Sequence, residues 1–394
     1  MSYKNIYILG VGGSGMSSIA KYLKQKGDNV IGYDQRKSYV TNLLNQDGIK
    51  VVHTLDEITY KPHSLYIYSS AIPIESDRFE DFHDKENVLS RPEYLKNLSE
   101  NHKIIGITGT HGKTSTTALL SHIFHFNNVN VSYLYGGITT FNGIGGHYGD
   151  PDQPLILETD EAFNTFEKIK ISDLLVLNVD SDHLDYFKNL DNYKDAFYKV
   201  MKNVTDNLVI NNDDLNIKSM KELKNPVSYG KDTSADFKVQ SPGNFKYENN
   251  KYEIKSDIIG DHFKANMLGA IILALLNGIE IKDSLNAIES FAGVKRRIEL
   301  IGISKGVLIY DDYGHHPTEM EATITALKQQ TKSKLYVVFQ PHRYTRTMEY
   351  FSSFKDSLKL ADFAIVTDIY PAGESPIPGI SSKNFEEESI KYLK

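Results

Sequence analysis

Residues 106–115, GITGTHGKTS, have the composition of a loop that binds the phosphates of a nucleotide. In such a loop Lys113 would reach the β and γ phosphates of ATP, the Thr114 hydroxyl would bind Mg²⁺, and the glycines would let the backbone approach closely. The spacing is not that of a regular Walker A motif, which needs glycine where this chain has Ile107. We predict an ATP loop formed by Gly109, Thr110, His111, Gly112, Lys113, Thr114 and Ser115.

A second glycine-rich turn lies near the N-terminus, in LGVGGSGMSS at 9–18. It stands between a strand-like and a helix-like run, where a helix N-terminus can face an anion. Asp34 ends the next predicted strand, the position of a ribose-binding acid in dinucleotide folds. A turn needed only for packing is the alternative, and the pattern does not separate NAD from another nucleotide. Two loops predict two phosphorylated ligands, with the substrate's nucleotide held by Gly12, Gly13, Ser14 and Gly15.

Composition narrows the class of protein. The 394 residues are enough for two or three domains, and 40% hydrophobic with 24% charged residues is typical of a globular protein. The net charge of -7 and the lack of a basic run speak against a nucleic-acid partner. With no Cys, thiolate chemistry is excluded. The longest apolar stretch, at 267–276, is well short of the roughly 20 residues that span a bilayer, so we expect a cytoplasmic protein with no membrane partner.

Short apolar runs alternate with helix-like segments along the chain, which predicts parallel sheets built from βαβ units. The alternation restarts at 103 with KIIGITG and again after 293–299, GVKRRIE. We therefore predict three α/β domains, at 1–100, 101–294 and 295–394. The stretch 225–258 reads as antiparallel strands and turns, an insertion in the middle domain.

Together with the two loops, further motifs resemble those of the ATP-dependent Mur ligases of cell-wall synthesis, above all the alanine-adding members. The motifs are SSAIP at 69–73, ETDE at 158–161, NVDSDHLDYF at 178–187, GVKRRIE at 293–299, DDYGHHPTE at 311–319, FQPHRYTRT at 339–347 and YPAGESPIPGIS at 370–381. They follow the family's order over nearly the whole chain.

The resemblance implies a fold and an activity. The N-terminal Rossmann-like domain would hold the UDP part of UDP-N-acetylmuramate, a central P-loop-type ATPase sheet would hold ATP, and a C-terminal Rossmann-like domain would close over ATP and the amino acid. The lactyl carboxylate would attack the γ-phosphate to give an acyl phosphate, and the amine of L-alanine would then displace phosphate. The sequence leaves open whether the enzyme is a monomer or a homodimer.

The resemblance also implies site residues. For the metal these are Thr114, Glu158 and His183; for catalysis Lys113, His183, His315, Arg343 and Arg346; for ATP also His262, Asn266 and Arg296; and for the substrate Asp34, His53, Ser69, Arg91, Asn178 and His342. Arg297 is an alternative to Arg296, either in nucleotide contact or at a hinge, and His316 could be a buried hydrogen-bonding residue. Arg343 and Arg346 would share one face if their segment is helical.

Three features depart from the family pattern. Ala162 and Phe163 replace the usual Ser-Asp after ETDE, and Phe263 replaces an Asn after His262. The chain ends at Lys394, where family members continue through further strands. We expect a shortened C-terminal domain with an exposed sheet edge.

Three other functions compete with alanine addition. A recycling ligase would join a whole peptide to UDP-N-acetylmuramate, but the GHHP and QPHRYTRT blocks favour the alanine-adding members. A catalytically silent UDP-sugar binder would not need the complete phosphoryl-transfer set. An NAD-dependent dehydrogenase would leave the loop at 106–115 without a purpose.

Overall fold

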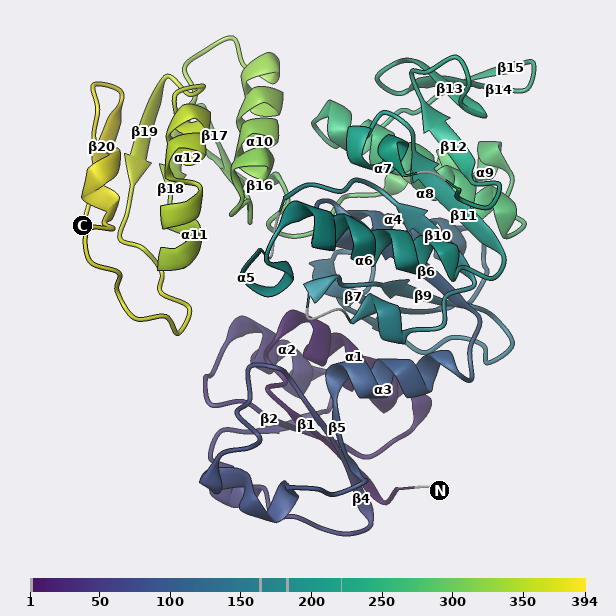
Figure 1. Cartoon of the computed structure of the whole chain (residues 1–394), viewed down its shortest axis with the longest axis vertical. Helices are drawn as coiled ribbons and strands as arrows, with labels where there is room; N and C mark the ends of the chain where they lie inside the picture. Colours follow the sequence, from purple (N-terminus) through teal and green to yellow (C-terminus); the bar gives the residue numbers. More distant parts are fainter. Residues whose placement is uncertain (1–2, 163–164, 182–183, 221) are drawn as a thin grey trace. The chain divides into compact units, whose positions relative to one another are not determined.

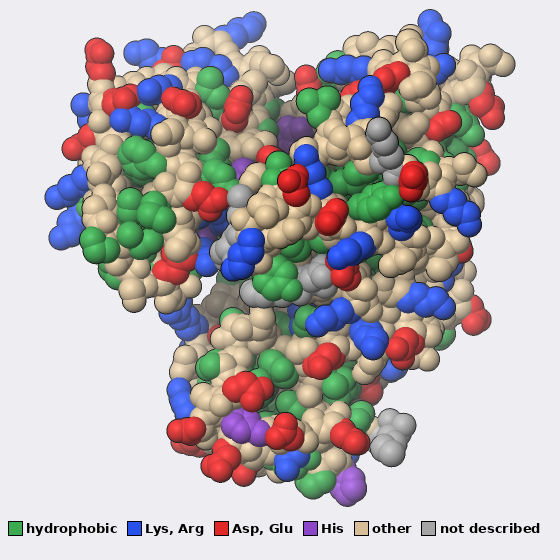
Figure 2. Space-filling view, viewed as in Figure 1, with side chains coloured by type: hydrophobic (Ala, Val, Ile, Leu, Met, Phe, Trp, Pro, Cys, Tyr) green, Lys and Arg blue, Asp and Glu red, His purple; other side chains and the backbone are tan. Residues whose placement is uncertain are grey.

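The computed structural model describes residues 3–162, 165–181, 184–220 and 222–394. The chain divides into two compact units, Met1–Ser256 with Ala265–Val294, and Asp257–Lys264 with Lys295–Lys394. Within the described ranges, no helix has both the length and the apolar character needed to cross a membrane. On the face shown in Figure 2, basic side chains alternate with acidic ones instead of gathering in one patch.

The first unit begins with a five-stranded parallel sheet of order β3-β2-β1-β4-β5 (Figure 1). This is the βαβ arrangement that the alternating pattern predicts. Because β1 is central, the glycine-rich turn that follows it lies at the carboxyl edge of the sheet, where α/β folds bind ligands. The elements are β1 (Asn5–Leu9), α1 (Ser14–Lys26), β2 (Val30–Tyr33), α2 (Tyr39–Gln46), β3 (Lys50–Val52), β4 (Ser64–Tyr68), β5 (Val88–Ser90) and α3 (Arg91–Ser99).

A ten-stranded sheet follows, of order β15-β14-β13-β12-β11-β10-β6-β9-β7-β8. Its strand β6 (Ile104–Thr108) is buried along its whole length between β9 and β10, so the second glycine-rich loop leaves the middle of the sheet. The other strands are β7 (Ser132–Thr139), β8 (Gly143–His147), β9 (Leu155–Glu158), β10 (Asp173–Val176), β11 (Asn207–Asn211), β12 (Val227–Gly230), β13 (Phe237–Ser241), β14 (Asn244–Tyr247) and β15 (Asn250–Glu253). The helices along this part of the chain are α4 (Lys113–Phe126), α5 (Leu184–Phe187), α6 (Leu190–Lys202), α7 (Leu215–Ser219), α8 (Asp261–Leu276) and α9 (Ile281–Ser290).

The segment predicted as an antiparallel insertion extends this sheet. β13, β14 and β15 do pair antiparallel. However, β12 pairs parallel with both β11 and β13, so the antiparallel prediction is wrong for that strand.

Helix α1 packs on the β7–β8 hairpin and joins the two sheets of the first unit. A Cβ on Gly146 would lie 2.0 Å from the carbonyl oxygen of Ser18, so only glycine fits this contact. The buried Lys21 side chain donates from Nζ to the carbonyl oxygens of Asn142 and Ile144. One hydrophobic core runs across the junction and includes side chains of α1 and of both strands. The two phosphate-loop candidates are therefore carried by a single packed body.

The second unit contains an antiparallel pair, β16 (Glu299–Ser304) and β17 (Val307–Asp311), and a parallel sheet of order β18-β19-β20. Its remaining elements are α10 (Pro317–Gln330), β18 (Tyr336–Phe339), α11 (Tyr344–Glu349), α12 (Phe351–Leu358), β19 (Phe363–Val366) and β20 (Ile390–Tyr392). In 295–394, all of which the structure describes, β17 pairs only with β16 and β18 only with β19, so each keeps an unpaired edge. Val338 of β18 is 71% exposed.

Candidate active site

The ATP-loop candidate connects β6 to α4 through backbone conformations that favour glycine. Gly109 has φ +143° and Gly112 φ +85°. A Cβ on Gly112 would lie 2.4 Å from Nδ2 of Asn266, so the predicted adenine-contact residue Asn266 packs directly on the loop. The backbone N–H of Thr110 donates to the carbonyl oxygen of Asn178 (3.1 Å). The loop is thus held against the end of the neighbouring strand.

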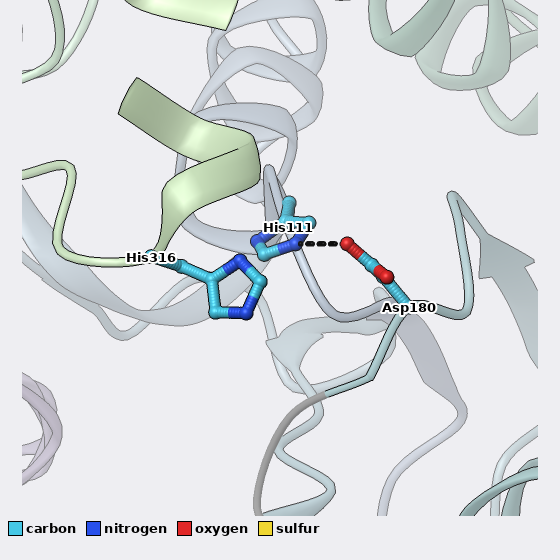
Figure 3. Close-up of side chains that lie close together, drawn as sticks. All are labelled: His111, Asp180 and His316. Carbon is cyan, nitrogen blue, oxygen red and sulfur yellow. Dashed lines mark hydrogen bonds and ion pairs between the residues drawn. The ribbon is translucent and has the colours of Figure 1, made fainter. Parts of the chain in front are cut away.

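His111 is fixed by two residues that follow β10. The Asn178 amide accepts from the His111 N–H (2.8 Å) and donates to the His111 carbonyl (2.9 Å). The His111 Nε2 lies 3.1 Å from Oδ2 of Asp180 (Figure 3). Asn178, predicted as a substrate contact, therefore lies at the ATP loop and supports it.

Lys113 is the first residue of α4, and its ammonium group lies inside the loop. It donates to the carbonyl oxygens of Gly109 (2.7 Å) and Thr110 (3.2 Å), and it lies 3.0 and 2.9 Å from the two carboxylate oxygens of Glu161. Burial lowers the pKa of Lys113, but Glu161, Asp160 and Glu158 outweigh it, so the pKa is raised and the side chain stays charged. The sequence prediction missed Glu161, although ETDE contains it.

Thr114 and Glu158 meet at the point where the resemblance implies a metal. The Thr114 hydroxyl donates to Glu158 Oε1 (2.8 Å), and the Gly136 N–H donates to Oε2 (2.6 Å). A hydroxyl and a carboxylate this close offer the hard oxygen ligands that Mg²⁺ prefers. The third predicted ligand, His183, lies outside the described residues, as does Phe163.

The turn after β1 brings the predicted UDP-site residues together. The Gly12 N–H donates to Oδ2 of Asp34 (2.9 Å), and His53 Nδ1 is 2.7 Å from the Asp34 carbonyl oxygen. A Cβ on Gly10 would lie 3.0 Å from Cβ of Ser69. These contacts place Asp34, His53 and Ser69 around a single turn.

Arg91 approaches the same turn from the start of α3. Ser90 caps this helix through a reciprocal hydrogen-bond pair with Glu93, which sets the position of Arg91 in the first turn. A Cβ on Gly15 would lie 2.8 Å from Nε of Arg91, and Arg91 Nη1 is 3.9 Å from Asp160 Oδ2. Arg91 thus connects the first loop to the segment that also carries Glu158 and Glu161.

In the second unit, the predicted amino-acid site gathers around His342. The His315 and His342 rings are 5.8 Å apart, and Arg343 Nε lies 2.6 Å from Glu374 Oε1. Burial, then His315 and two arginines, lower the pKa of His342 to about 4. Burial also lowers the pKa of His315, against the opposing charge of Glu319. Both imidazoles are therefore neutral at neutral pH.

The helix-face interpretation of the two arginines is wrong for Arg343. Helix α11 begins at Tyr344, and Arg343 precedes it with φ 73°, its N–H donating to the Tyr370 carbonyl (2.8 Å). Arg346 lies in the helix and is only 9% exposed.

The other predicted residues of this unit have defined places. His316 is buried and caps α10, consistent with the interpretation of His316 as a buried hydrogen-bonding residue.

Arg296 lies 3.3 Å from Asp311 and over the Tyr313 ring. Arg297 lies 3.9 Å from Glu319. His262 contacts the ring of Phe263.

A central parallel strand leading into a loop with Lys and Thr, followed by a helix, defines a nucleotide-binding α/β protein. Family models identify which one. The Mur ligase middle domain matches residues 107–274, the "Mur ligase, glutamate ligase domain" matches 296–391, and the "Mur ligase family, catalytic domain" matches 5–103. The chain belongs to the Mur ligase family.

Individual relatives agree with this membership. The UDP-N-acetylmuramate–L-alanine ligase of Dictyoglomus turgidum is 35% identical over 98% of this chain and 86% of its own. The ligase of the same name from Caldicellulosiruptor saccharolyticus is 36% identical over 98% of this chain and 88% of its own. The fold resembles that of UDP-N-acetylmuramate-alanine ligase from Thermotoga maritima (TM-score 0.79, 24% identity, covering 99% of this chain and 94% of the other). It also resembles a murein peptide ligase from Psychrobacter arcticus (TM-score 0.71, 23% identity, covering 93% and 85%).

Proposed function

We propose that this chain is an ATP-dependent ligase that joins L-alanine to the lactyl carboxylate of UDP-N-acetylmuramate in peptidoglycan synthesis. The main support is the similarity, over 98% of this chain, to two proteins named UDP-N-acetylmuramate–L-alanine ligase. The structure adds independent support, because the first unit carries both phosphate-loop candidates and the second of them contains Lys113, whose side chain is 12% exposed. We assign UDP to the first loop, ATP to the second and the reaction to the cytoplasm.

The first step makes the carboxylate reactive. A lactyl carboxylate oxygen forms a bond to the γ-phosphorus while the bond from that phosphorus to the β,γ-bridging oxygen breaks, which leaves an acyl phosphate and ADP. Such a transfer depends mainly on positioning and on neutralising charge. Lys113 supplies a charged ammonium in the loop, and the Gly109 and Gly112 conformations let the backbone approach the phosphates.

Mg²⁺ would be held by Thr114 and Glu158, together with His183, and would neutralise phosphate charge. The Gly136 N–H orients the Glu158 carboxylate from the other side. On the first loop, Arg91 adds a positive charge beside Gly15, which suits the diphosphate of the substrate.

In the second step the amine nitrogen of alanine bonds to the acyl carbon, and the bond from that carbon to the phosphate oxygen breaks. Arg343 and Arg346 would hold the carboxylate of alanine and the acyl phosphate, because a guanidinium offers a planar pair of donors. His315 and His342 are neutral at neutral pH, so these imidazoles can accept a proton or a hydrogen bond from the amine.

The substrate assignment is tested by product analysis. Purified protein is incubated with ATP, Mg²⁺ and UDP-N-acetylmuramate, and with either L-alanine or a murein tripeptide, and products are identified by mass spectrometry. We expect the alanine adduct to form much faster than the tripeptide adduct. The reverse preference would assign the chain to peptide recycling, and binding of UDP-N-acetylmuramate without any adduct would indicate a silent binder.

A further inference from the structure

The ammonium group of Lys113 has no hydrogen-bond donor to spare in this structure. Such a group has three N–H donors, and oxygen atoms of Gly109, Thr110 and Glu161 lie within 3.2 Å of Nζ. A phosphate oxygen can therefore bind Lys113 only if one of these three contacts is given up. Two of the acceptors are carbonyls of the loop itself, which the contacts with Asn178 and the end of β6 hold in place.

Of the three acceptors, Glu161 is the one that a phosphate oxygen can replace, because it is not part of the loop. Its contact with Lys113 is also an ion pair. Its side chain is 1% exposed and that of Lys113 is 12% exposed, so water screens the pair poorly. Charge-assisted contacts of this kind are roughly twice as strong as neutral hydrogen bonds. The bound phosphates of a nucleotide would bring several negative charges next to the same carboxylate, which like-charge repulsion opposes.

The neighbouring acids make different contacts. Glu158 accepts from Thr114 and Gly136, and Asp160 lies near Arg91. Glu158, Asp160 and Glu161 thus each meet a different group, and the Glu161 carboxylate contacts the lysine of the loop.

We propose that Glu161 is a positioning residue that holds Lys113 when no nucleotide is bound and is exchanged for a phosphate oxygen when nucleotide binds. The proposal rests on the proposed function only for the identity of the ligand, ATP. The exchange opposes ground-state binding, so removing the charge of Glu161 tightens nucleotide binding. Because the exchange takes place when nucleotide binds, removing the charge stabilises the bound ground state and the transition state alike, which lowers KM for ATP.

The test is nucleotide binding by calorimetry, with ADP and a non-hydrolysable ATP analogue, in the absence of the other substrates. Glu161→Gln keeps an oxygen acceptor for Lys113 and removes the charge. Glu167→Gln is the matched control, because Glu167 belongs to the same segment and is exposed. We expect Glu161→Gln to bind both nucleotides about tenfold more tightly than the wild type, with and without Mg²⁺, and the control to bind like the wild type.

Unchanged or weaker binding by Glu161→Gln would overturn the proposal. Weakening confined to solutions with Mg²⁺ would also overturn it, since it would make Glu161 a metal ligand. In the ligase reaction, the same variant should lower KM for ATP.

A second measurement needs no variant that might fold poorly. In a crystal structure of the wild type with the ATP analogue, Lys113 Nζ should contact a phosphate oxygen and lie beyond 3.5 Å from Glu161, and retention of the Glu161 contact would refute the exchange. A wild type that binds nucleotide but forms no amide would refute the ligase assignment, while these binding data would still decide the role of Glu161.

Discussion

Replacing Gly146 by Ala tests whether the contact between α1 and the β7–β8 hairpin sets the geometry of the two loops. The added Cβ would lie 2.0 Å from the Ser18 carbonyl oxygen and 2.8 Å from its carbonyl carbon, both backbone atoms. Because Cβ atoms essentially never approach closer than 3.0 Å, the helix and the hairpin must separate by about 1 Å.

The size of the effect follows from that displacement. Overpacking of this kind costs about 1–3 kcal/mol of unfolding free energy. Helix α1 begins at the first phosphate loop, and the same hairpin carries Gly136, the donor to Glu158. A misplacement of about 1 Å between reacting groups lowers turnover roughly 100-fold, whereas nucleotide binding at the second loop should change little.

The assay combines urea unfolding, calorimetry with ADP and steady-state turnover. Gly302→Ala is the control, because a Cβ on Gly302 in β16 has no atom within 4 Å. If Gly146→Ala matched this control in both stability and turnover, the hairpin contact would not position the loops.

Three further predictions concern single side chains. Lys113→Ala should abolish turnover while calorimetry shows nearly unchanged binding of UDP-N-acetylmuramate, and wild-type turnover would contradict the role given to Lys113. The His342 ring should titrate near pH 4 in an NMR experiment. Because its pKa is lower in the folded than in the unfolded protein, the unfolded state binds more protons between pH 6.5 and about 4. Its contribution to stability is therefore complete above pH 6.5 and is lost as the pH falls through that window, whereas a midpoint near 6.5 would refute the burial argument. Arg343→Lys should raise KM for L-alanine about tenfold, since lysine lacks the planar donor pair, and an unchanged KM would place the carboxylate elsewhere.

The parts of the fold that were predictable depend on local patterns. The buried run of β6, the glycine-rich turns after β1 and β6, and the helix that Pro317 opens are visible because each follows from residue type and short-range spacing. Non-local pairing was not predictable. The direction of β12 is set by its parallel pairing with β11, a contact that the local sequence pattern does not specify. Arg343 lies outside the helix, and its N–H donates to the carbonyl oxygen of Tyr370, which is distant in the sequence.

In the candidate site, too, features that depend on local sequence were predictable and contacts between distant residues were not. Lys113 and Thr114 could be found from the loop motif, because their chemistry belongs to a contiguous stretch. The ion pair between Lys113 and Glu161 depends on the parallel pairing of β6 with β9, which brings the end of β9 beside the loop. The sequence shows an acid at 161 but not its burial, so its contact with the lysine could be learned only from the structure.

The most direct test of the ligase account is phosphate release from ATP and Mg²⁺ by the purified protein with UDP-N-acetylmuramate, in the presence and absence of L-alanine. Lys113→Ala serves as the inactive control. The account predicts sustained phosphate release only when both substrates are present, with one amide formed for each phosphate. Phosphate release that ignores L-alanine, or none at all from protein that binds both nucleotides, would contradict it.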